Sequence, residues 1–418
     1  MNHYNSVCVV GLGYIGLPTG CLLASKGYRV FGCDINADLV NLINQGQLPF
    51  VENDLDHLLQ QVISEGKFSA FLKPTAADVF IIAVPTPFDE HRQPRLDYIE
   101  SAIRSVAPHV KPGNLIILES TSPVGATEKM AEWLAEERSD LTLPVRVGVA
   151  KESQIFIAHC PERVLPGRIL LELVENDRVV GGIDASSGES ARRFYETFVQ
   201  GQVSVTDVRT AEMTKLAENA FRDVNIAFAN ELANVCQLQS INPYELIRLA
   251  NRHPRVNILK PGPGVGGHCI AVDPWFIVSS APKATPLIRC AREVNDARPL
   301  QVVEEVKKRL PQMQQPIIAC LGLAFKANID DLRESPALWI TEQLMQFGKV
   351  LVVEPHIKAL PASLSSAELV SLEEAFEKVN MVVLLVDHQA FLNIPADWLA
   401  GKEIIDTRGI WEYESLVS

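Results

Sequence analysis

A glycine- and proline-rich stretch at residues 261–275 carries the residues best suited to covalent chemistry. Four glycines and two prolines between Pro261 and Gly267 exclude a helix or a regular strand there and predict a tight loop. The loop delivers Cys269, and the carboxylate of Asp273 follows four residues later. A cysteine with a nearby acid can act as a covalent nucleophile, whereas most lone cysteines are inert core residues.

A second set of polar residues lies in a predicted helix from about residue 209 to 239, a stretch without proline or glycine. Apolar residues cover most of its circumference, so we expect the helix to be largely buried. Lys215, Asn219 and Arg222 follow one another at i, i+4 and i+7 along one stripe. Because a buried lysine is costly unless it is paired or functional, the stripe either meets a substrate beside Cys269 or forms a salt-bridged, solvated face.

The elements that would position a cofactor lie near the N-terminus. An apolar run at residues 7–10 predicts a strand buried on both faces, and Gly11, Gly13 and Gly16 follow it as Gly-x-Gly-x-x-Gly. Gly11 permits a tight turn, Gly13 lets the backbone reach a pyrophosphate, and Gly16 allows close packing of the following helix. A second predicted strand ends at Asp34, whose carboxylate would bind the adenosine ribose and favours NAD over NADP.

Two further apolar runs, residues 78–84 and 114–118, lead into loops rich in proline and hydroxyl groups. Ligands of an open parallel sheet bind beyond the carboxyl ends of its strands, so Thr86, Thr121 and Thr127 are candidates for a nicotinamide site. For each threonine an ordinary hydroxylated turn is the alternative.

Charged residues at two other places suit an anionic ligand. Glu162 and Arg163 follow an apolar run at residues 154–158, beside prolines, which predicts a site at that strand end. His253 and Arg255 precede the glycine-rich loop, where they either meet an anionic sugar nucleotide or coat the surface.

The C-terminal part again alternates strands and helices. A helical pattern from about residue 286 to 310 precedes it, and its apolar runs are residues 317–321, 350–353, 381–386 and 403–406. This alternation predicts a second doubly wound unit, although Gly-x-Gly-x-x-Gly is absent from it. After its first strand the charged residues are Lys326, Asp330, Asp331, Arg333 and Glu334.

Length and composition limit the class of protein. With 418 residues, 47% of them hydrophobic and 21% charged, the chain is expected to be globular with two or three domains. A net charge of −13 argues against nucleic-acid binding, although local arginines can still hold an anionic ligand. We expect no membrane span and no signal peptide. Eight scattered cysteines without Cys-x-x-Cys predict a cytoplasmic location and no metal site.

Taken together, these motifs resemble the UDP-glucose/GDP-mannose dehydrogenase family over essentially the whole chain. The resemblance is carried by residues 10–18, 84–87, 119–125, 161–164, 215–219, 251–257, 264–273 and 325–334. It implies oxidation of a sugar-nucleotide primary alcohol to a carboxylate with two NAD and no metal. The implied substrate is UDP-N-acetyl-D-mannosamine, and the implied products feed bacterial surface polysaccharides such as the enterobacterial common antigen.

The resemblance also assigns roles to residues of this chain. Cys269 captures the aldehyde as a thiohemiacetal, a second hydride transfer gives a thioester, and water hydrolyses it. Lys215 and Asn219 stabilise the oxyanions, and Asp273 manages protons at Lys215 or at the hydrolytic water. Glu162 and Thr121 match residues that handle protons through water.

Binding residues follow from the same matches. For NAD, besides the three glycines, they are Tyr14, Ile15, Asp34, Thr86, Thr127 and Arg333. For the UDP-sugar they are Arg163, Val164, Lys215, Asn219, Arg222, His253, Arg255, Gly266, Phe325 and Lys326. The residues that match His253 and Arg255 reach a neighbouring subunit's site in the family, which implies a homodimer.

Two departures from the glucose branch favour an N-acetylated hexosamine. Val265 and Val272 stand where that branch usually has an aromatic residue and a lysine, and Glu119 stands where it tends to have a lysine. Mannosamine rather than glucosamine rests on the resemblance alone, so UDP-N-acetylglucosamine and UDP-glucose remain alternatives. The others are a two-electron dehydrogenase with a structural Cys269 and a non-catalytic nucleotide-sugar sensor.

We therefore expect an α/β fold with two Rossmann-like doubly wound domains joined by a central helical region that contains a long helix. The expected divisions are an NAD-binding domain at residues 1–205, a central dimerisation and catalytic region at 206–310, and a UDP-sugar-binding domain at 311–418.

Overall fold

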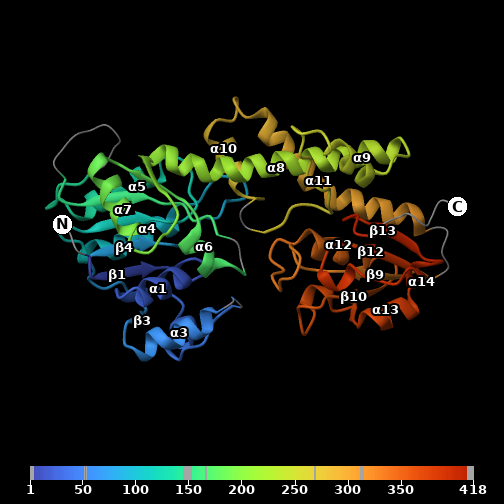
Figure 1. The fold of residues 1–418 in the computed structure, drawn as a ribbon, viewed down its shortest axis with the longest axis horizontal. Helices are drawn as coiled ribbons and strands as arrows, with labels where there is room; N and C mark the ends of the chain where they lie inside the picture. Colours follow the sequence, from blue (N-terminus) through green and yellow to red (C-terminus); the bar gives the residue numbers. More distant parts are fainter. Residues whose placement is uncertain are drawn as a thin grey trace. The chain divides into compact units, whose positions relative to one another are not determined.

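The computed structural model describes residues 4–50, 52, 54–144, 153–164, 167–267, 270–310 and 315–411. The chain divides into two compact units, Met1–Glu218 and Asn219–Ser418 (Figure 1). Cys269, the predicted nucleophile, and its neighbour His268 lie outside the described residues. The predicted division into three domains stays a prediction.

The first unit is built on an eight-stranded sheet with the order β3-β2-β1-β4-β5-β6-β7-β8. Its strands are β1 (Ser6–Val10), β2 (Arg29–Cys33), β3 (Phe68–Phe71), β4 (Val79–Ile82), β5 (Leu115–Leu118), β6 (Phe156–His159), β7 (Arg178–Gly182) and β8 (Val203–Asp207). Neighbouring strands are parallel except for β6 and β7. The order reverses beside β1, which is the arrangement of a doubly wound sheet.

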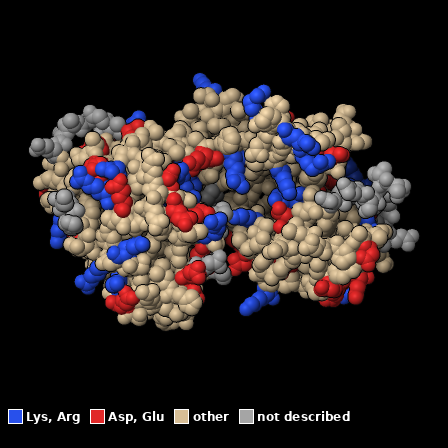
Figure 2. Space-filling model, in the orientation of Figure 1, with Lys and Arg blue, Asp and Glu red and all other residues tan. Residues whose placement is uncertain are grey.

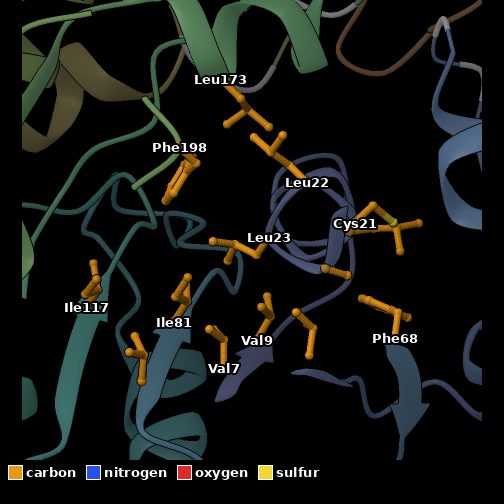
Figure 3. Packing of buried hydrophobic residues seen from close by; sticks show 14 of the residues in the cluster. Val7, Val9, Cys21, Leu22, Leu23, Phe68, Ile81, Ile117, Leu173 and Phe198 are labelled. Atoms are coloured by element: carbon orange, nitrogen blue, oxygen red, sulfur yellow. The ribbon is translucent and has the colours of Figure 1, made fainter. Parts of the chain in front are cut away.

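Helices cover both faces of this sheet because its central strands are apolar on both sides. They are α1 (Gly16–Ser25), α2 (Ala37–Asn44), α3 (Leu55–Ser64), α4 (Asp97–Val106), α5 (Ala126–Glu137), α6 (Ile169–Glu175) and α7 (Ala185–Tyr195), with a 3₁₀ turn at Ala107–His109. Val7 and Val9 join the core cluster under α1, whereas Cys8 and Val10 join the cluster under α4 and α5. Figure 3 shows Leu23 of α1 next to Val9 and Ile81 of the sheet.

The second unit contains a five-stranded sheet with the order β11-β10-β9-β12-β13, parallel throughout. Its strands are β9 (Ile317–Leu321), β10 (Lys349–Val353), β11 (Glu368–Leu369), β12 (Met381–Leu384) and β13 (Glu403–Asp406). Its helices are α9 (Pro243–Ala250), α10 (Asp273–Ser280), α11 (Pro286–Arg309), α12 (Pro336–Leu344), α13 (Leu372–Lys378) and α14 (Ala396–Leu399), with 3₁₀ turns at Ala362–Leu364 and Gln389–Phe391. The side chains of β9 alternate between two core clusters, as expected for a sheet covered on both faces.

The two sheets begin with the same turn. Gly11 has a φ of +95° and its N–H donates to the Cys33 carbonyl at 2.8 Å. Gly322 has a φ of +91° and its N–H donates to the Val353 carbonyl at 2.9 Å. The second unit therefore repeats the strand–turn geometry of the first without its glycine motif.

A single long helix, α8 (Val208–Leu238), runs from the first unit into the second. The prediction of two Rossmann-like domains joined by a helical region with a long helix is confirmed. The expectation that α8 is largely buried is wrong for the single chain, since Phe221 is 72% exposed and Leu238 is 84% exposed. Leu216 and alanines such as Ala220 lie on the buried face of α8, whereas several large apolar side chains lie outside it.

The surface and the cysteines agree with the composition. Figure 2 shows acidic and basic side chains interspersed on the visible face of each unit. No helix in the described part of the chain has both the length and the apolar character of a membrane span. The cysteines within the described ranges carry free thiols.

Candidate functional site

The turn between β1 and α1 has the space that a dinucleotide needs. A Cβ at Gly11 would lie 2.5 Å from the Ala83 carbonyl oxygen, and one at Gly16 would lie 1.8 Å from the Gly11 carbonyl oxygen. At Gly13 a Cβ would meet nothing within 4 Å. Two glycines are thus required by packing within the protein, whereas Gly13 faces open space at the start of α1. A helix start of this kind favours a bound phosphate.

The carboxylate of Asp34 is held at the end of β2 by the backbone. Its Oδ2 accepts the Leu12 N–H at 2.9 Å, and its Oδ1 accepts the Asn36 N–H at 3.0 Å. The ring of Tyr14 stacks on Phe50 with centroids 4.1 Å apart. Asp34, at the end of β2, is thus hydrogen-bonded to the turn that carries Tyr14, a second predicted NAD contact. Ile15 directly precedes α1 as its N-cap residue.

Beyond β4, one predicted cofactor residue has an orphaned polar atom. The Thr86 hydroxyl oxygen is buried and has no hydrogen-bond partner among the residues that the structure describes. A buried hydroxyl without a partner is destabilising unless a ligand or water completes it. Thr86 is therefore suited to a bound cofactor.

The loop after β5 is tied to its neighbours. The Ser120 hydroxyl donates to the Val84 carbonyl at 2.6 Å, which joins this loop to the one after β4. Glu212 of α8 accepts both the N–H and the hydroxyl of Thr127, at 2.8 and 2.7 Å, and the Gly125 N–H at 2.6 Å. Burial raises the pKa of Glu212 to about 7, and these donors act in the opposite direction.

These contacts give Thr127 a structural task. Thr127 is buried, and its N–H and hydroxyl hold the start of α5 against Glu212 of α8. Glu212 lies three residues before Lys215. The contact of Thr127 with NAD stays a prediction. Thr121, in the middle of the same loop, is partly exposed and remains accessible to a ligand.

The two charges after β6 have partners inside the first unit. Glu162 is buried, and its Oε2 accepts from Arg178 Nη1 at 2.5 Å while its Oε1 accepts the Arg163 N–H at 2.6 Å. The guanidinium of Arg163 donates to Glu218 Oε1 at 2.8 Å and to the Asp177 carbonyl. Val164 packs against the core cluster under α1. Substrate binding by Arg163 and Val164 stays a prediction.

In the second unit two predicted catalytic residues meet. Asn219 Nδ2 donates to Asp273 Oδ2 at 2.5 Å. Asp273 is buried and begins α10. Lys215 precedes Asn219 by one helical turn on α8, and Arg222 is exposed on the same helix.

The glycine-rich loop is pressed against the loop after β9. A Cβ at Gly266 would lie 2.5 Å from the Glu334 carbonyl oxygen and 2.8 Å from the Cβ of Phe325. Gly267 has a φ of +79°, and its Cβ would lie 3.0 Å from the Phe325 ring. The predicted substrate residues Gly266 and Phe325 are thus brought together immediately before the position of Cys269. The structure explains these two glycines by packing within the protein.

Two buried residues that the sequence did not single out fix the start of this loop. The Gly262 N–H donates to Asn230 Oδ1 at 2.9 Å, and Arg298 Nε donates to the Gly262 carbonyl at 3.0 Å. Their only signal in the sequence is a polar residue inside a helical pattern, which does not reveal a partner 32 or 36 residues away.

The remaining predicted binding residues lie near or at the surface of the second unit. Arg333 is paired with Asp331 at 2.6 Å, and Lys326 is half-buried. His253 and Arg255 are exposed, and the Arg255 N–H donates to His253 Nδ1 at 3.3 Å. Their contacts with NAD or substrate stay predictions.

One cluster in the described ranges, Glu354 with His356 and His388, has the spacing of a metal site. Two of its three groups are already engaged: His388 Nε2 and Glu354 Oε2 are 3.0 Å apart, and His388 Nδ1 accepts the Asn328 N–H at 2.9 Å. The proton of His388 therefore lies on Nε2, which removes the lone pair that a metal would need. Hydrogen bonding accounts for the positions of Glu354 and His388.

Comparison with protein families covers nearly the whole chain. The NAD binding domain of the UDP-glucose/GDP-mannose dehydrogenase family matches residues 5–199. The central domain of that family matches residues 209–297, and its UDP binding domain matches residues 319–413.

Individual relatives match from end to end. The chain is 57% identical to an NDP-N-acetyl-D-galactosaminuronic acid dehydrogenase of Ralstonia nicotianae, covering 99% of this chain and 98% of the relative. It is 52% identical to the UDP-N-acetyl-D-mannosamine dehydrogenase of Escherichia coli K12, covering 98% and 99%. A solved UDP-D-ManNAc dehydrogenase from Pyrococcus horikoshii superimposes with a TM-score of 0.88 at 38% identity, covering 99% and 97%.

The dinucleotide turn of the first unit agrees with this match, because its open Gly13 and its fixed Asp34 suit NAD. The chain belongs to the UDP-glucose/GDP-mannose dehydrogenase family and is an NAD-dependent UDP-sugar dehydrogenase.

Proposed function

We propose that this enzyme oxidises C6 of UDP-N-acetyl-D-mannosamine to the carboxylate, using two NAD for each sugar nucleotide. The observation that carries the proposal is the hydrogen bond between Asn219 and Asp273, because it joins two residues predicted to serve Cys269. Relatives named UDP-N-acetyl-D-mannosamine dehydrogenase, at 55% and 52% identity over nearly the whole chain, support the choice of sugar.

In the proposed reaction NAD supplies the hydride acceptor for both oxidations. After the first hydride has left C6, the Cys269 thiolate attacks the aldehyde carbon and forms a carbon–sulfur bond. The second hydride leaves that carbon, and the product is a thioester. Water then attacks the thioester, the carbon–sulfur bond breaks, and the thiolate is released with the uronate.

The chain's polar residues would act on the oxygen and the protons of these steps. Lys215 and Asn219 stabilise the negative charge that develops on the C6 oxygen. Asp273, which accepts from Asn219, manages protons at Lys215 or at the hydrolytic water. Glu162 and Thr121 pass protons through water.

The residues of the first unit fit NAD. Gly13 leaves open space at the start of α1, Asp34 is held by the Leu12 N–H of the same turn, and Thr86 has a buried hydroxyl oxygen without a partner in the described part. Tyr14, Thr127 and Arg333 remain predicted contacts.

A second candidate substrate is a nucleotide of N-acetylgalactosamine, because relatives at 57% identity are named for its uronic acid. A screen for NADH formation over UDP-N-acetylmannosamine, UDP-N-acetylglucosamine, UDP-N-acetylgalactosamine and UDP-glucose separates the candidates. We expect the highest kcat/KM with UDP-N-acetylmannosamine. A clear preference for UDP-glucose overturns the proposal, and the absence of NADH with all four favours a sensor.

We also propose that the enzyme is a cytoplasmic homodimer that serves surface polysaccharide synthesis. Support for the dimer comes from exposed apolar residues of α8 at heptad spacing, Phe221, Phe228 and Val235. A second copy of the chain would bury this stripe. His253 and Arg255 are exposed, as residues that reach a neighbouring subunit's site must be before assembly.

A further inference from the structure

A buried polar cluster surrounds Glu162 in the first unit. Glu119 and Glu162 lie in the segments that follow β5 and β6, Arg178 begins β7, and Tyr195 ends α7. Glu119 and Arg178 are each 2% exposed, and Tyr195 is fully buried. The cluster thus places two carboxyl groups and one guanidinium out of contact with bulk water.

The four side chains form a continuous series of contacts. Arg178 Nη1 donates to Glu162 Oε2 at 2.5 Å, and the Arg178 guanidinium carbon lies 5.6 Å from the centre of the Tyr195 ring. The Tyr195 hydroxyl donates to Glu119 Oε1 at 2.6 Å. Glu119 is therefore linked to Glu162 through Tyr195 and Arg178.

The charges of this cluster do not balance if both carboxyl groups are ionised. Glu162 accepts from the Arg178 guanidinium and from the Arg163 N–H, which stabilises its negative charge. Glu119 accepts from the neutral Tyr195 hydroxyl, and its Oε2 has no partner in the described ranges. A second buried carboxylate without a cation of its own is costly, so one proton remains in the cluster.

We propose that Glu119 is a positioning residue that holds this proton, so that Glu162 carries the one negative charge that Arg178 neutralises. Oε1 already accepts the Tyr195 hydroxyl, so the proton of Glu119 lies on Oε2. The catalytic consequence rests on the proposed role of Glu162 in proton transfer, whereas the protonation of Glu119 does not.

The neighbouring titratable groups support this distribution. Burial and repulsion from Glu162 raise the pKa of Glu119 to about 7, against the opposing effects of Arg178 and Tyr195. Burial raises the pKa of Cys160 to about 12 and also raises that of Tyr195, so neither takes the negative charge. Burial lowers the pKa of His159 to about 3, so this imidazole adds no positive charge.

Glu119 and Glu162 both face one cation, the guanidinium of Arg178. When Glu119 loses its proton, Arg178 is shared between two carboxylates, and the guanidinium neutralises the charge of Glu162 less completely. The electrostatic environment of Glu162 therefore changes with the protonation of Glu119, although Glu119 is not a predicted substrate contact.

The test begins on the substrate-free, full-length enzyme. Infrared difference spectra recorded across neutral pH follow the C=O band of a protonated carboxyl group. We expect the wild-type enzyme to lose one such band as the pH rises, Tyr195→Phe to lose it at higher pH, and Glu119→Gln to lack it. The proposal is overturned if Glu119→Gln retains the band or if the wild type has none.

Thermal unfolding at pH 6 gives a second readout. Glu119→Gln mimics the protonated side chain and should unfold within about 2 °C of the wild type. Glu162→Gln leaves the buried Arg178 without its anion and should unfold at least several degrees lower, or fail to fold. If Glu119→Gln instead unfolds at a lower temperature than Glu162→Gln, the negative charge lies on Glu119 and the proposal is wrong.

Kinetics separates this inference from the proposed function. With the sugar nucleotide that gives NADH, kcat/KM of the wild type should show an inflection at the pH where the infrared band is lost, and Glu119→Gln should not show it. An unchanged inflection in Glu119→Gln refutes the role of Glu119. If no sugar nucleotide is oxidised, the proposed function fails and the infrared result still decides the protonation of Glu119.

Discussion

The side-chain amide of Asn219 donates a hydrogen bond to Oδ2 of Asp273 at 2.5 Å, although the two residues are 54 positions apart. Asn219 lies on α8 one turn after Lys215, and Asp273 ends the stretch that contains Cys269. A hydrogen bond from an amide to a buried carboxylate is strong and fixes both groups. The long helix and the glycine-rich loop are therefore joined at residues with predicted chemical roles.

The first prediction concerns this bond. Asn219→Ala removes the donor to a buried carboxylate and a predicted oxyanion ligand, so kcat should fall about 10²- to 10³-fold and stability by about 1–3 kcal/mol. Steady-state kinetics and urea unfolding measure the two effects. Asn225→Ala, on the same helix, removes only a hydrogen bond to the Phe221 carbonyl. Its kcat should stay within about twofold of the wild-type value, a change of well under 1 kcal/mol in activation free energy. Equal kcat values for both variants would refute the role of Asn219.

The second prediction concerns the glycine-rich loop. Gly266→Ala places a Cβ 2.5 Å from the backbone oxygen of Glu334, so the loop must shift, and a misplacement of about 1 Å costs about 100-fold in kcat. In the control Gly27→Ala, with a φ of +100° and no atom within 4 Å, backbone strain alone should lower stability by about 1–2 kcal/mol without changing kcat. Wild-type kcat in Gly266→Ala contradicts the packing argument.

The third prediction separates two glycines of the dinucleotide turn. The Cβ added in Gly13→Ala meets no protein atom within 4 Å, so the melting temperature should be unchanged. KM for NAD should rise at least about tenfold, because this Cβ would contact the pyrophosphate. Gly16→Ala would place its Cβ 1.8 Å from the Gly11 carbonyl oxygen and should prevent stable folding. Circular dichroism and NAD titration measure both effects. An unchanged KM in Gly13→Ala would show that NAD does not pass over this residue.

The fourth prediction gives the sign of a pH effect on stability. The pKa of Glu119 is raised from 4.5 to about 7 on folding, so the folded state retains a proton that the unfolded chain loses. The contribution of Glu119 to the free energy of unfolding is fully present below about pH 4.5. As the pH rises through about 7 this contribution, about 3 kcal/mol, is lost. Urea unfolding at pH 5 and pH 8 should show a smaller loss in Glu119→Gln than in the wild type. Equal losses would mean that Glu119 does not titrate in this range.

The fifth prediction tests the homodimer. Phe228→Glu places a charge in the exposed apolar stripe of α8 and should convert a dimer into a monomer in light scattering after gel filtration. Glu231→Gln, an exposed position on the same helix, should remain dimeric. A monomeric wild type, or a dimeric Phe228→Glu, would exclude the stripe as the interface.

The strands with continuous apolar runs were predictable from sequence. Those at Ile317–Leu321 and Glu403–Asp406 begin and end where the apolar runs do, and α8 begins and ends within one residue of its pattern. The strands β3, β7, β8 and β11 were not predicted. Phe68–Phe71 and Glu368–Leu369 are short, Val203–Asp207 is partly exposed with polar residues, and Arg178–Gly182 begins with a cation. Local patterns thus predict buried elements better than the outer strands of the sheet.

The site was predictable only where a motif is contiguous. The glycine turn and Asp34 belong to one local motif, and their geometry follows from it. Arg178 and Glu212 bind partners 16 and 85 residues away, and no local periodicity encodes such contacts. A cation at the start of the apolar run Arg178–Gly182 is the one signal that could have indicated a buried ion pair.

The stoichiometry of NADH tests the proposed four-electron oxidation through Cys269. With limiting UDP-N-acetylmannosamine, we expect two NADH per sugar nucleotide and a uronic acid product, with Cys269→Ser stalled before completion. One NADH per sugar nucleotide with an aldehyde product, or near-normal turnover by Cys269→Ser, would contradict it.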